Sequence, residues 1–421
     1  MLLVCVEKSR DFFRWSWNPF RVRYVDHGIE ESLALDRKMA FLCGPRQVGK
    51  TTTARALLGA RDAGYFNWDV DRHRRAILRD PGSFWATGPE APSKPVRIVL
   101  DEIHKYPRWK RFLKGLYDGH RDALEVLVTG SGRLDVYQKG GDSLLGRYNL
   151  YHLHPFTLGE LLANGNQAIL SPAELGQRIE ASEASPGAAE GLDLVERMSG
   201  FPEPLFAGRD RLLERWRRSR RQLVLREDLR DLTRIRELGL VDQLVALLPG
   251  RIGSPLSINA LREDLQVAFD TVQGWIETLG RLYYLFELRP FAGKLARTLR
   301  REGKVYLFDP TEIEDPGARF ENLVALHLLK LVDTWNDGGH GDFDLSYVRD
   351  KEKREVDFLV TDRRKPFLLV EAKLSDDSPA PALRYFAERL APRWAVQVVR
   401  QGVGRPGPCR VIPAERFLAW M

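Results

Sequence analysis

The stretch that decides the fold is residues 39–53, which read Met-Ala-Phe-Leu-Cys-Gly-Pro-Arg-Gln-Val-Gly-Lys-Thr-Thr-Thr. Five apolar residues predict a short strand, the pattern G-x-x-x-x-G-K-T follows it, and the threonines begin a helix. Gly44 and Gly49 allow the backbone to bend so that successive N–H groups point into one concavity, which suits a phosphate. The positive end of the helix dipole faces the same place. The alternative is a turn between two glycines that binds nothing, and the flanking strand and helix argue against it.

The side chains of this loop carry the matching chemistry. Lys50 is expected to reach the β- and γ-phosphates of a nucleotide, and the Thr51 hydroxyl is expected to ligate Mg²⁺. The sequence therefore predicts ATP and Mg²⁺ as cofactors. The residues of the loop that we expect to bind the nucleotide are Gly44, Pro45, Arg46, Gln47, Val48, Gly49, Lys50, Thr51 and Thr52.

Residues 65–69 predict a second strand, and the next, at residues 96–102, is apolar and ends in two carboxylates, Asp101 and Glu102. It reads as a buried parallel strand, and ligands of open α/β sheets bind at the carboxyl ends of such strands. Asp101 is expected to hold Mg²⁺, mostly through water, and Glu102 to act as general base for the attacking water. The alternative is a solvated acidic turn, and the phosphate-loop pattern upstream argues against it.

Polar side chains also accompany the next two predicted strands. Residues 124–132 form a strand that ends in hydroxyls, so Thr129 or Ser131 is expected to sense the γ-phosphate or the lytic water. An ordinary Gly-Ser turn is the alternative. Arg147 precedes the strand at residues 148–153 and is expected to act as an arginine finger on a neighbouring subunit's nucleotide. It would otherwise cap a helix or pair with a carboxylate. The finger interpretation predicts a homo-oligomer.

These strands alternate with helical linkers long enough for crossovers, which predicts an α/β fold with a parallel, doubly wound sheet. A helical lid is expected after the sheet. Within it, residues 184–191 read as a loop, and residues 199–204 break the helix. The Gly and Pro residues of this break shape the adenine pocket or form an ordinary turn.

Composition sets the broader class. A chain of 421 residues suggests two or three domains, and 43% hydrophobic residues are enough for sizeable cores. No apolar run is long enough to span a membrane, and the N-terminus lacks a secretory signal pattern. Three scattered cysteines suit a reducing cytoplasm. The net charge of +7 permits a nucleic-acid partner. The aromatic and basic residues of 1–36 predict a helix packed on the core, with an aromatic-basic surface as the alternative.

Two segments in the middle of the chain suggest contact with nucleic acid. Residues 209–236 contain eleven arginines against five acids, which fits either a solvated helix or a ridge that faces phosphates. Residues 241–308 predict a winged helix: helices at 241–248, 258–265 and 270–282, then a hairpin with basic Lys294, Arg297, Arg300 and Arg301 in its tip. Such domains read DNA through the third helix or serve as lids or dimer surfaces.

The last segment predicts a separate site. A helix begins around Glu321, and three strands follow, the second with Asp357 and the third with Glu371 and Lys373. Side chains two apart share a face of a strand, and Asp357 on the neighbouring strand is expected beside them. Two or three carboxylates suit Mg²⁺ or Mn²⁺, and a lysine can activate water. We expect Asp357, Glu371 and Lys373 as catalytic residues, with Glu321, Asp357 and Glu371 as metal ligands. The E-x-K spacing alone also occurs on solvated strands.

The order of these parts resembles a family of prokaryotic AAA-type (AAA+) P-loop ATPases with a C-terminal restriction-endonuclease-like domain of uncharacterised function. The resemblance extends from about Val25 to the end of the chain. It departs at Ser199-Gly200, where the family more often has two glycines. It implies ATP binding, an AAA-like lid, a winged helix and a PD-(D/E)xK nuclease-like tail. The segments that carry it are Gly44–Thr52, Leu100–Lys105, Thr129–Ser131, Leu145–Arg147, Gly200–Glu203, Phe320–Val324, Glu355–Phe358, Val411–Pro413 and Phe417–Leu418.

We therefore expect three domains: an ATPase with N-terminal extension and lid at 1–208, a basic helix and winged helix at 209–310, and a nuclease-like domain at 311–421. The predicted function is a cytoplasmic AAA+ ATPase that hydrolyses ATP to control a tail acting on DNA or RNA. One alternative is a regulatory switch that binds a protein partner and carries a catalytically inactive tail. The other is a DNA-binding protein that uses the winged helix.

Overall fold

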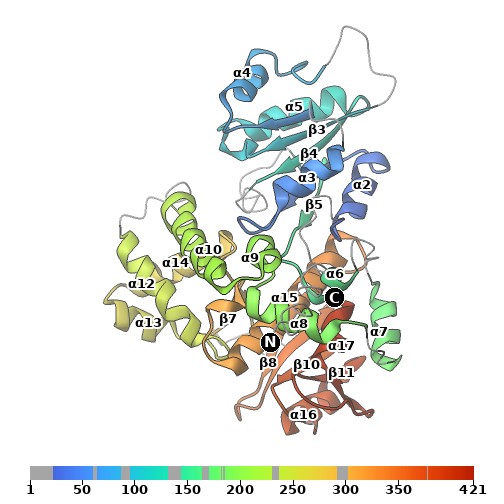
Figure 1. The fold of residues 1–421 in the computed structure, drawn as a ribbon, viewed down its shortest axis with the longest axis vertical. Coiled ribbons are helices and arrows are strands. Elements are labelled where there is room, and N and C mark those ends of the chain that lie inside the picture. The colour runs from blue at the N-terminus through green and yellow to red at the C-terminus, as the bar shows by residue number, and fades with distance from the viewer. Residues whose placement is uncertain are drawn as a thin grey trace, which may run out of the picture. The chain divides into compact units, whose positions relative to one another are not determined.

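The computed structural model describes residues 22–59, 64–86, 95–130, 144–163, 170–181, 183, 185–229, 237–291, 302–376 and 378–421 (Figure 1). The chain forms two compact units, one within Asn18–His154 and one that contains Pro155–Met421. The predicted domain boundaries at 208 and 310 both fall inside the second unit and stay predictions. Ser131, the basic hairpin tip and the aromatic residues before position 22 lie outside the described residues.

The first unit contains a sheet of five parallel strands in the order β2-β3-β4-β1-β5. The predicted parallel α/β sheet is therefore confirmed. Every residue of β1 is buried, as expected for a strand covered on both faces. The strands are β1 (Met39–Cys43), β2 (Tyr65–Asn67), β3 (Val96–Asp101), β4 (Leu124–Thr129) and β5 (Tyr148–His152).

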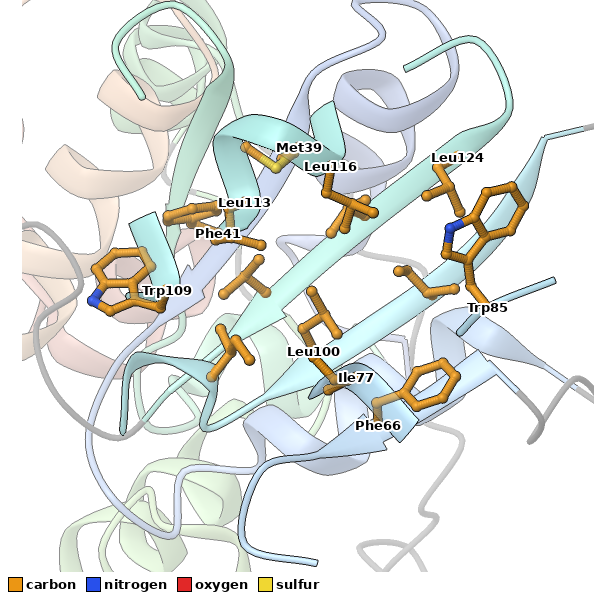
Figure 2. Close-up of a cluster of buried hydrophobic side chains, with 14 of the residues drawn as sticks. Met39, Phe41, Phe66, Ile77, Trp85, Leu100, Trp109, Leu113, Leu116 and Leu124 are labelled. Carbon is orange, nitrogen blue, oxygen red and sulfur yellow. The ribbon is translucent and has the colours of Figure 1, made fainter. Parts of the chain in front are cut away.

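Helices cover both faces of this sheet. On one face, Met39 and Phe41 of β1 pack with side chains of α4 (Asp71–Arg79) and α5 (Trp109–His120) in an apolar cluster (Figure 2). The intervening residues of β1 are buried too, because α2 (Asp26–Ala34) and α3 (Lys50–Leu58) pack against the sheet. The short 3₁₀ helix η2 (Ile103–Lys105) follows β3.

The second unit contains a mixed sheet in the order β12-β11-β10-β9-β8. Strands β8 to β10 pair antiparallel, and β10 to β12 pair parallel. Helices α15 (Pro316–Asp337) and α16 (Pro381–Leu390) pack against it. The strands are β8 (Phe343–Arg349), β9 (Glu355–Asp362), β10 (Lys365–Lys373), β11 (Trp394–Val399) and β12 (Cys409–Pro413). The short helix α17 (Ala414–Phe417) and the 3₁₀ helix η7 (Leu418–Trp420) end the chain.

The helices that precede this sheet belong to the same unit. They are α6 (Leu158–Leu162), α7 (Pro172–Ala181), α8 (Ala188–Met198), α9 (Pro202–Ala207) and α10 (Asp210–Leu223), which continues into η4 (Val224–Asp228). The predicted loop at 184–191 is wrong in its second half, because α8 already begins at Ala188 after Gly187 at φ 75°. The predicted break after position 198 is confirmed, because α8 ends at Met198 and α9 begins at Pro202.

Three helices and a hairpin follow, in the order that the sequence predicts. Ser257 begins the second of them, and its side chain accepts a hydrogen bond from the Ala260 backbone N–H. The winged-helix assignment itself stays a prediction. The elements are α12 (Leu238–Leu247), η5 (Leu248–Arg251), α13 (Ile258–Leu265), α14 (Phe269–Arg281), β6 (Leu285–Leu288) and β7 (Lys304–Leu307), then η6 (Pro310–Glu312).

Candidate functional site

The loop between β1 and α3 has the backbone shape that its glycines predict. Gly44 has φ +150°, and a Cβ added to it would lie 2.2 Å from the Leu153 carbonyl oxygen. Gly49 has φ +106° and forms the N-cap of α3. Only glycine fits the first position without a clash, and the second lies in a region that glycine favours. The loop is therefore bent tightly around the beginning of α3.

Lys50 points back over this loop and is almost fully buried. Its Nζ donates hydrogen bonds to the carbonyl oxygens of Gly44 at 2.9 Å and Pro45 at 2.7 Å. The Gln47 side-chain oxygen is buried without a hydrogen-bond partner among the described residues. Of the other predicted loop residues, Pro45 and Val48 are buried, whereas Arg46 and Thr52 are half-buried.

Asp101 is the centre of a buried hydrogen-bond network at the end of β3. Thr51 donates to its Oδ2 at 3.0 Å, so the loop and the strand meet through the two predicted Mg²⁺ ligands. Tyr65 donates to the same oxygen at 2.6 Å, and Asn67 donates to it at 3.3 Å. Thr129 donates to Oδ1 at 2.5 Å, so in this structure the predicted sensor holds the carboxylate.

The Tyr65 hydroxyl stays protonated in this network. Burial and the hydrogen bond to Asp101 raise the pKa of Tyr65 to about 12. Tyr65 is therefore a permanent donor that keeps Asp101 oriented near neutral pH.

Glu102 is held in an unusual backbone conformation directly after β3. Its φ is 57°, which is uncommon for a residue with a side chain, and its N–H donates to the Thr129 carbonyl at 2.9 Å. The Glu102 carboxylate lies 3.3 Å from Lys105 Nζ, which also contacts Asp69 at 2.6 Å. The positive φ turns Glu102 away from the strand direction, and residues in such strained conformations cluster at active sites.

His104 lies beside the same carboxylate, with its Nε2 3.7 Å from Glu102 Oε2. Burial lowers the pKa of His104, although the Glu102 charge raises it and the charges of Lys105 and Lys50 lower it further. His104 is therefore neutral at physiological pH and does not add a positive charge next to Glu102.

Arg147 lies at the other end of the sheet from the phosphate loop. It precedes β5, whose first residue pairs with Met39 at the beginning of β1, whereas the loop follows the end of β1. Its side chain makes two bonds to Asp118 of α5, from Nε at 2.7 Å and from Nη2 at 3.1 Å. Within one chain Arg147 is thus paired with a carboxylate. The finger role toward a neighbouring subunit stays a prediction.

The residues of the first unit fit a nucleotide and Mg²⁺. The bent backbone at Gly44, which has no Cβ, and the Lys50 ammonium group provide the close approach and the positive charge that a polyphosphate needs. Thr51 and Asp101 supply two adjacent oxygens, which are the donors that Mg²⁺ prefers.

The second unit brings the predicted carboxylates together as well. Lys373 Nζ lies 2.6 Å from Glu371 Oε1, as expected for side chains on one face of β10. The Asp357 N–H donates to Glu371 Oε2 at 3.4 Å, and the Ala372 N–H donates to Asp357 Oδ2 at 3.0 Å. The neighbouring strands β9 and β10 therefore place these three side chains as predicted.

A lysine that the sequence reasoning did not consider lies among these acids. Lys304, the first residue of β7, is 0% exposed. Its Nζ lies 2.7 Å from Glu355, 3.2 Å from Glu321 and 3.5 Å from Asp357. Burial alone would lower the pKa of Lys304, but the charges of Glu321, Asp357 and Glu355 raise it above its ordinary value. The lysine is therefore charged.

Two of the acids, Glu321 and Glu371, have strongly raised pKa values. Burial and the Asp357 charge raise the pKa of Glu321 to about 7, and the same two causes raise the pKa of Glu371 to about 7. Both carboxyl groups are therefore partly protonated near neutral pH.

These acids, as arranged, do not fit a divalent metal. A divalent cation bound to Asp357 would lie close to the positive charge of Lys304, whose Nζ is 3.5 Å from Asp357 Oδ1, and the Ala372 N–H already donates to Oδ2. The part of the chain that the structure describes contains no group of three or more His, Cys, Asp or Glu residues placed to hold a metal ion. Of the predicted ligands, Glu321 and Asp357 both contact the Lys304 ammonium group, whereas Glu371 contacts Lys373.

Several residues near these sites carry structural roles that sequence reasoning missed. Arg23 donates to the carbonyls of Val48 at 3.3 Å and His154 at 2.8 Å, which braces the phosphate loop. Tyr65 and Asn67 are two residues apart on β2 and therefore lie on the same face of the strand. The sequence could have indicated from this spacing that both side chains point to the same partner. Lys304 begins a short strand of ordinary composition, and no motif in the neighbouring sequence indicates that its side chain is buried among acids.

Comparisons with known proteins support a class for the first unit. The family described as AAA domain matches residues 36–162, which include the phosphate loop, Asp101 and Glu102. Together with the parallel sheet, this match supports an AAA-type P-loop ATPase domain. Two families described as domains of unknown function, DUF8612 and DUF4143, match residues 196–311 and 316–406. No described helix is long and apolar enough to cross a membrane.

Particular relatives resemble most of the chain. An uncharacterised protein of Mycobacterium tuberculosis and one of Mycobacterium bovis are each 22% identical over 404 residues, which cover 90% of this chain and 81% of theirs. Among solved structures, C. elegans PCH-2 aligns with 47% of this chain and 67% of its own at 13% identity. Its TM-score is 0.23, so this likeness carries no weight for the fold.

Proposed function

We propose that the first unit hydrolyses ATP and that its nucleotide state controls the second unit. The observation that carries the proposal is the 3.0 Å hydrogen bond between Thr51 Oγ1 and Asp101 Oδ2. It joins the loop that suits phosphates to the strand end that carries Glu102. The AAA domain match over the same residues supports this class of reaction.

Each residue has a defined part in this reaction. Lys50 leaves the loop carbonyls and neutralises charge on the transferred phosphoryl group. Glu102 orients the attacking water and accepts its proton. Thr51 and Asp101 would hold Mg²⁺, which would neutralise phosphate charge when it is bound. Arg147 would act in a neighbouring subunit after leaving Asp118.

The test is phosphate release by the full chain with ATP and Mg²⁺. Glu102→Gln should lower turnover at least about 100-fold, because general-base catalysis contributes about 10² to 10⁴. ATP binding should remain. Asp122→Asn is the control, since Asp122 is an exposed surface acid paired with Arg37. Equal turnover in Glu102→Gln and Asp122→Asn would remove Glu102 from the mechanism.

For the second unit, the Lys304 contacts favour the inactive-tail alternative over a metal-dependent nuclease. All three carboxylates of Glu321, Glu355 and Asp357 already have a cation between them. The decisive assay adds DNA or RNA with Mn²⁺ or Mg²⁺ and ATP. Cleavage by the unmodified chain that is lost in Asp357→Ala would instead support the nuclease prediction.

Contact with nucleic acid is a second proposal, and α10 supports it. Arg211, Arg215 and Arg218 are exposed at helical spacing, and none has an ion-pair partner among the described residues. In contrast, Arg217 binds Thr311 and Glu214, and Arg221 binds Asp242. Some arginines of this segment therefore stabilise the fold, whereas the exposed ones are available to bind phosphates.

Salt-dependent binding to duplex DNA tests this surface. Reversal of Arg211, Arg215 and Arg218 to Glu should weaken binding and reduce the salt slope by about 0.9 per lost phosphate contact. The control reverses three exposed arginines elsewhere in the same unit, Arg384, Arg389 and Arg393. Equal losses in both variants would show only an effect of net charge.

A further inference from the structure

The acidic cluster of the second unit consists of Glu321, Glu355, Asp357 and Glu371. These side chains come from α15, β9 and β10, and Asp357 and Glu371 are 8% and 4% exposed. Buried carboxylates that approach each other repel strongly unless a proton is retained or a cation lies among them. A positive charge among these side chains therefore stabilises the cluster.

The structure supplies that charge from the chain itself. Lys304 Nζ contacts three of the four carboxylates at 2.7–3.5 Å and is fully buried. The ring of Tyr347 lies 5.7 Å from the same Nζ, which adds a weaker favourable contact. The ammonium group thus takes the central position that a metal ion takes in a carboxylate site.

Further contacts fix Lys304 in this position. Asn322 of α15 accepts from the Leu307 N–H at 2.7 Å and donates to the Leu307 carbonyl at 2.8 Å, which ties the helix to β7. Tyr306 donates to Glu321 Oε1 at 2.7 Å. The strand that carries Lys304 is therefore attached to the helix that carries Glu321.

Most of the carboxylate oxygens already have partners. Glu355 contacts Lys304 through Oε1 and Arg349 through Oε2, at 2.7 and 3.0 Å. Glu371 contacts Lys373 through Oε1 at 2.6 Å and accepts from the Asp357 N–H through Oε2 at 3.4 Å. These donors hold the carboxylates in place around Lys304, and a metal ion could enter the native cluster only by displacing the Lys304 ammonium group.

We propose that the Lys304 ammonium group is a built-in substitute for a divalent cation in this acidic cluster. The cluster then binds no Mn²⁺ or Mg²⁺ in the native chain, and removal of the ammonium group opens a divalent-cation site. The proposal does not depend on ATP hydrolysis by the first unit. It assigns to Lys304 a role as the cation of a site that the E-x-K pattern alone would assign to a metal.

The experiment counts Mn²⁺ bound to the nucleotide-free full chain by electron paramagnetic resonance. Lys304→Met should bind one Mn²⁺ more than the unmodified chain, and Lys304→Met with Asp357→Asn should lose the gained ion. Mn²⁺ should also raise the melting temperature of Lys304→Met more than that of the unmodified chain. A folded Lys304→Met chain that gains no Mn²⁺ overturns the proposal.

A second comparison decides the matter if Lys304→Met does not fold. The unmodified chain and Asp357→Asn should bind the same number of Mn²⁺ ions, because the native cluster holds none. One ion fewer in Asp357→Asn would show that the native cluster binds metal despite Lys304, and the proposal would fail. Lys304→Gln, which keeps a polar group in the cluster, provides a milder variant for the gain of Mn²⁺.

Discussion

At the scale of single residues, the candidate nucleotide site depends on the hydrogen bonds that hold the Asp101 carboxylate in place. Four donors on three different elements converge on this carboxylate: Thr51, Tyr65, Asn67 and Thr129. Sequence reasoning predicted Thr51, Asp101 and Thr129, because motif spacing marks residues at strand ends. It missed Tyr65 and Asn67, because their role depends on the pairing of β2 with β3, which places Asn67 opposite Asp101.

Gly44→Ala should weaken nucleotide binding at least about tenfold. Its added Cβ would lie 2.2 Å from the Leu153 carbonyl oxygen at φ +150°, so the loop has to move. The control is Gly59→Ala, which is also at positive φ, +63°, but has nothing within 4 Å of the added Cβ. Nucleotide affinity is measured by calorimetric titration. Equal affinity in Gly44→Ala and the unmodified chain would mean that the loop geometry does not matter for binding.

At the scale of elements, sequence patterns predicted the strands and helices better than the contacts between them. The alternation along β10 predicted that Glu371 and Lys373 share a face, and their 2.6 Å contact confirms it. The approach of β7 to α15 could not be predicted, since it depends on Asn322 binding both polar groups of Leu307. That contact brings Lys304 into the acidic cluster. The metal-site prediction did not include Lys304, whose ammonium group lies among the acids.

Asn322→Leu should lower the free energy of unfolding by about 2–4 kcal/mol, because it leaves two buried backbone groups without partners. A matched control lies on the same helix: Asn336 makes the same two bonds to Phe343, both at 2.8 Å, but it is exposed. Water can replace those bonds, so Asn336→Leu should cost less than about 1 kcal/mol. Urea unfolding of both variants measures the difference. Equal costs would mean that the Leu307 contact does not lock β7 to α15.

At the scale of the whole molecule, both units hold buried charge, but in different ways. The first unit surrounds Asp101 with neutral donors, whereas the second surrounds the buried Lys304 with acids. Composition predicted sizeable cores and more than one domain, but it carries no information on charge burial. Strand alternation predicted that the acids lie together, and their actual environment required the structure.

The raised pKa values of Glu321 and Glu371 predict how stability depends on pH. An unfolded Glu has its pKa near 4.3, and these two groups have about 7 in the folded chain. Between about pH 4.5 and 7 the folded chain keeps protons that the unfolded chain releases, so this contribution to stability decreases as pH rises. Glu371→Gln removes the contribution of Glu371.

The free energy of unfolding of the unmodified chain, relative to Glu371→Gln, should therefore fall by at least about 1 kcal/mol from pH 5 to pH 7. The difference between the two chains isolates Glu371 from all other titrating groups. Urea unfolding at several pH values measures it. Parallel curves for the two chains would mean that Glu371 titrates normally in the folded state.

The central claim is that the loop at residues 44–51 binds a nucleoside triphosphate, and one titration tests it most directly. A fluorescent ATP analogue is titrated with Mg²⁺ into the unmodified chain, Lys50→Ala and the control Lys38→Ala, which removes a half-buried lysine just before β1. The unmodified chain and Lys38→Ala should bind alike, and Lys50→Ala should lose at least about 100-fold, or about 2.7 kcal/mol. Equal affinity in Lys50→Ala and the unmodified chain would contradict the account.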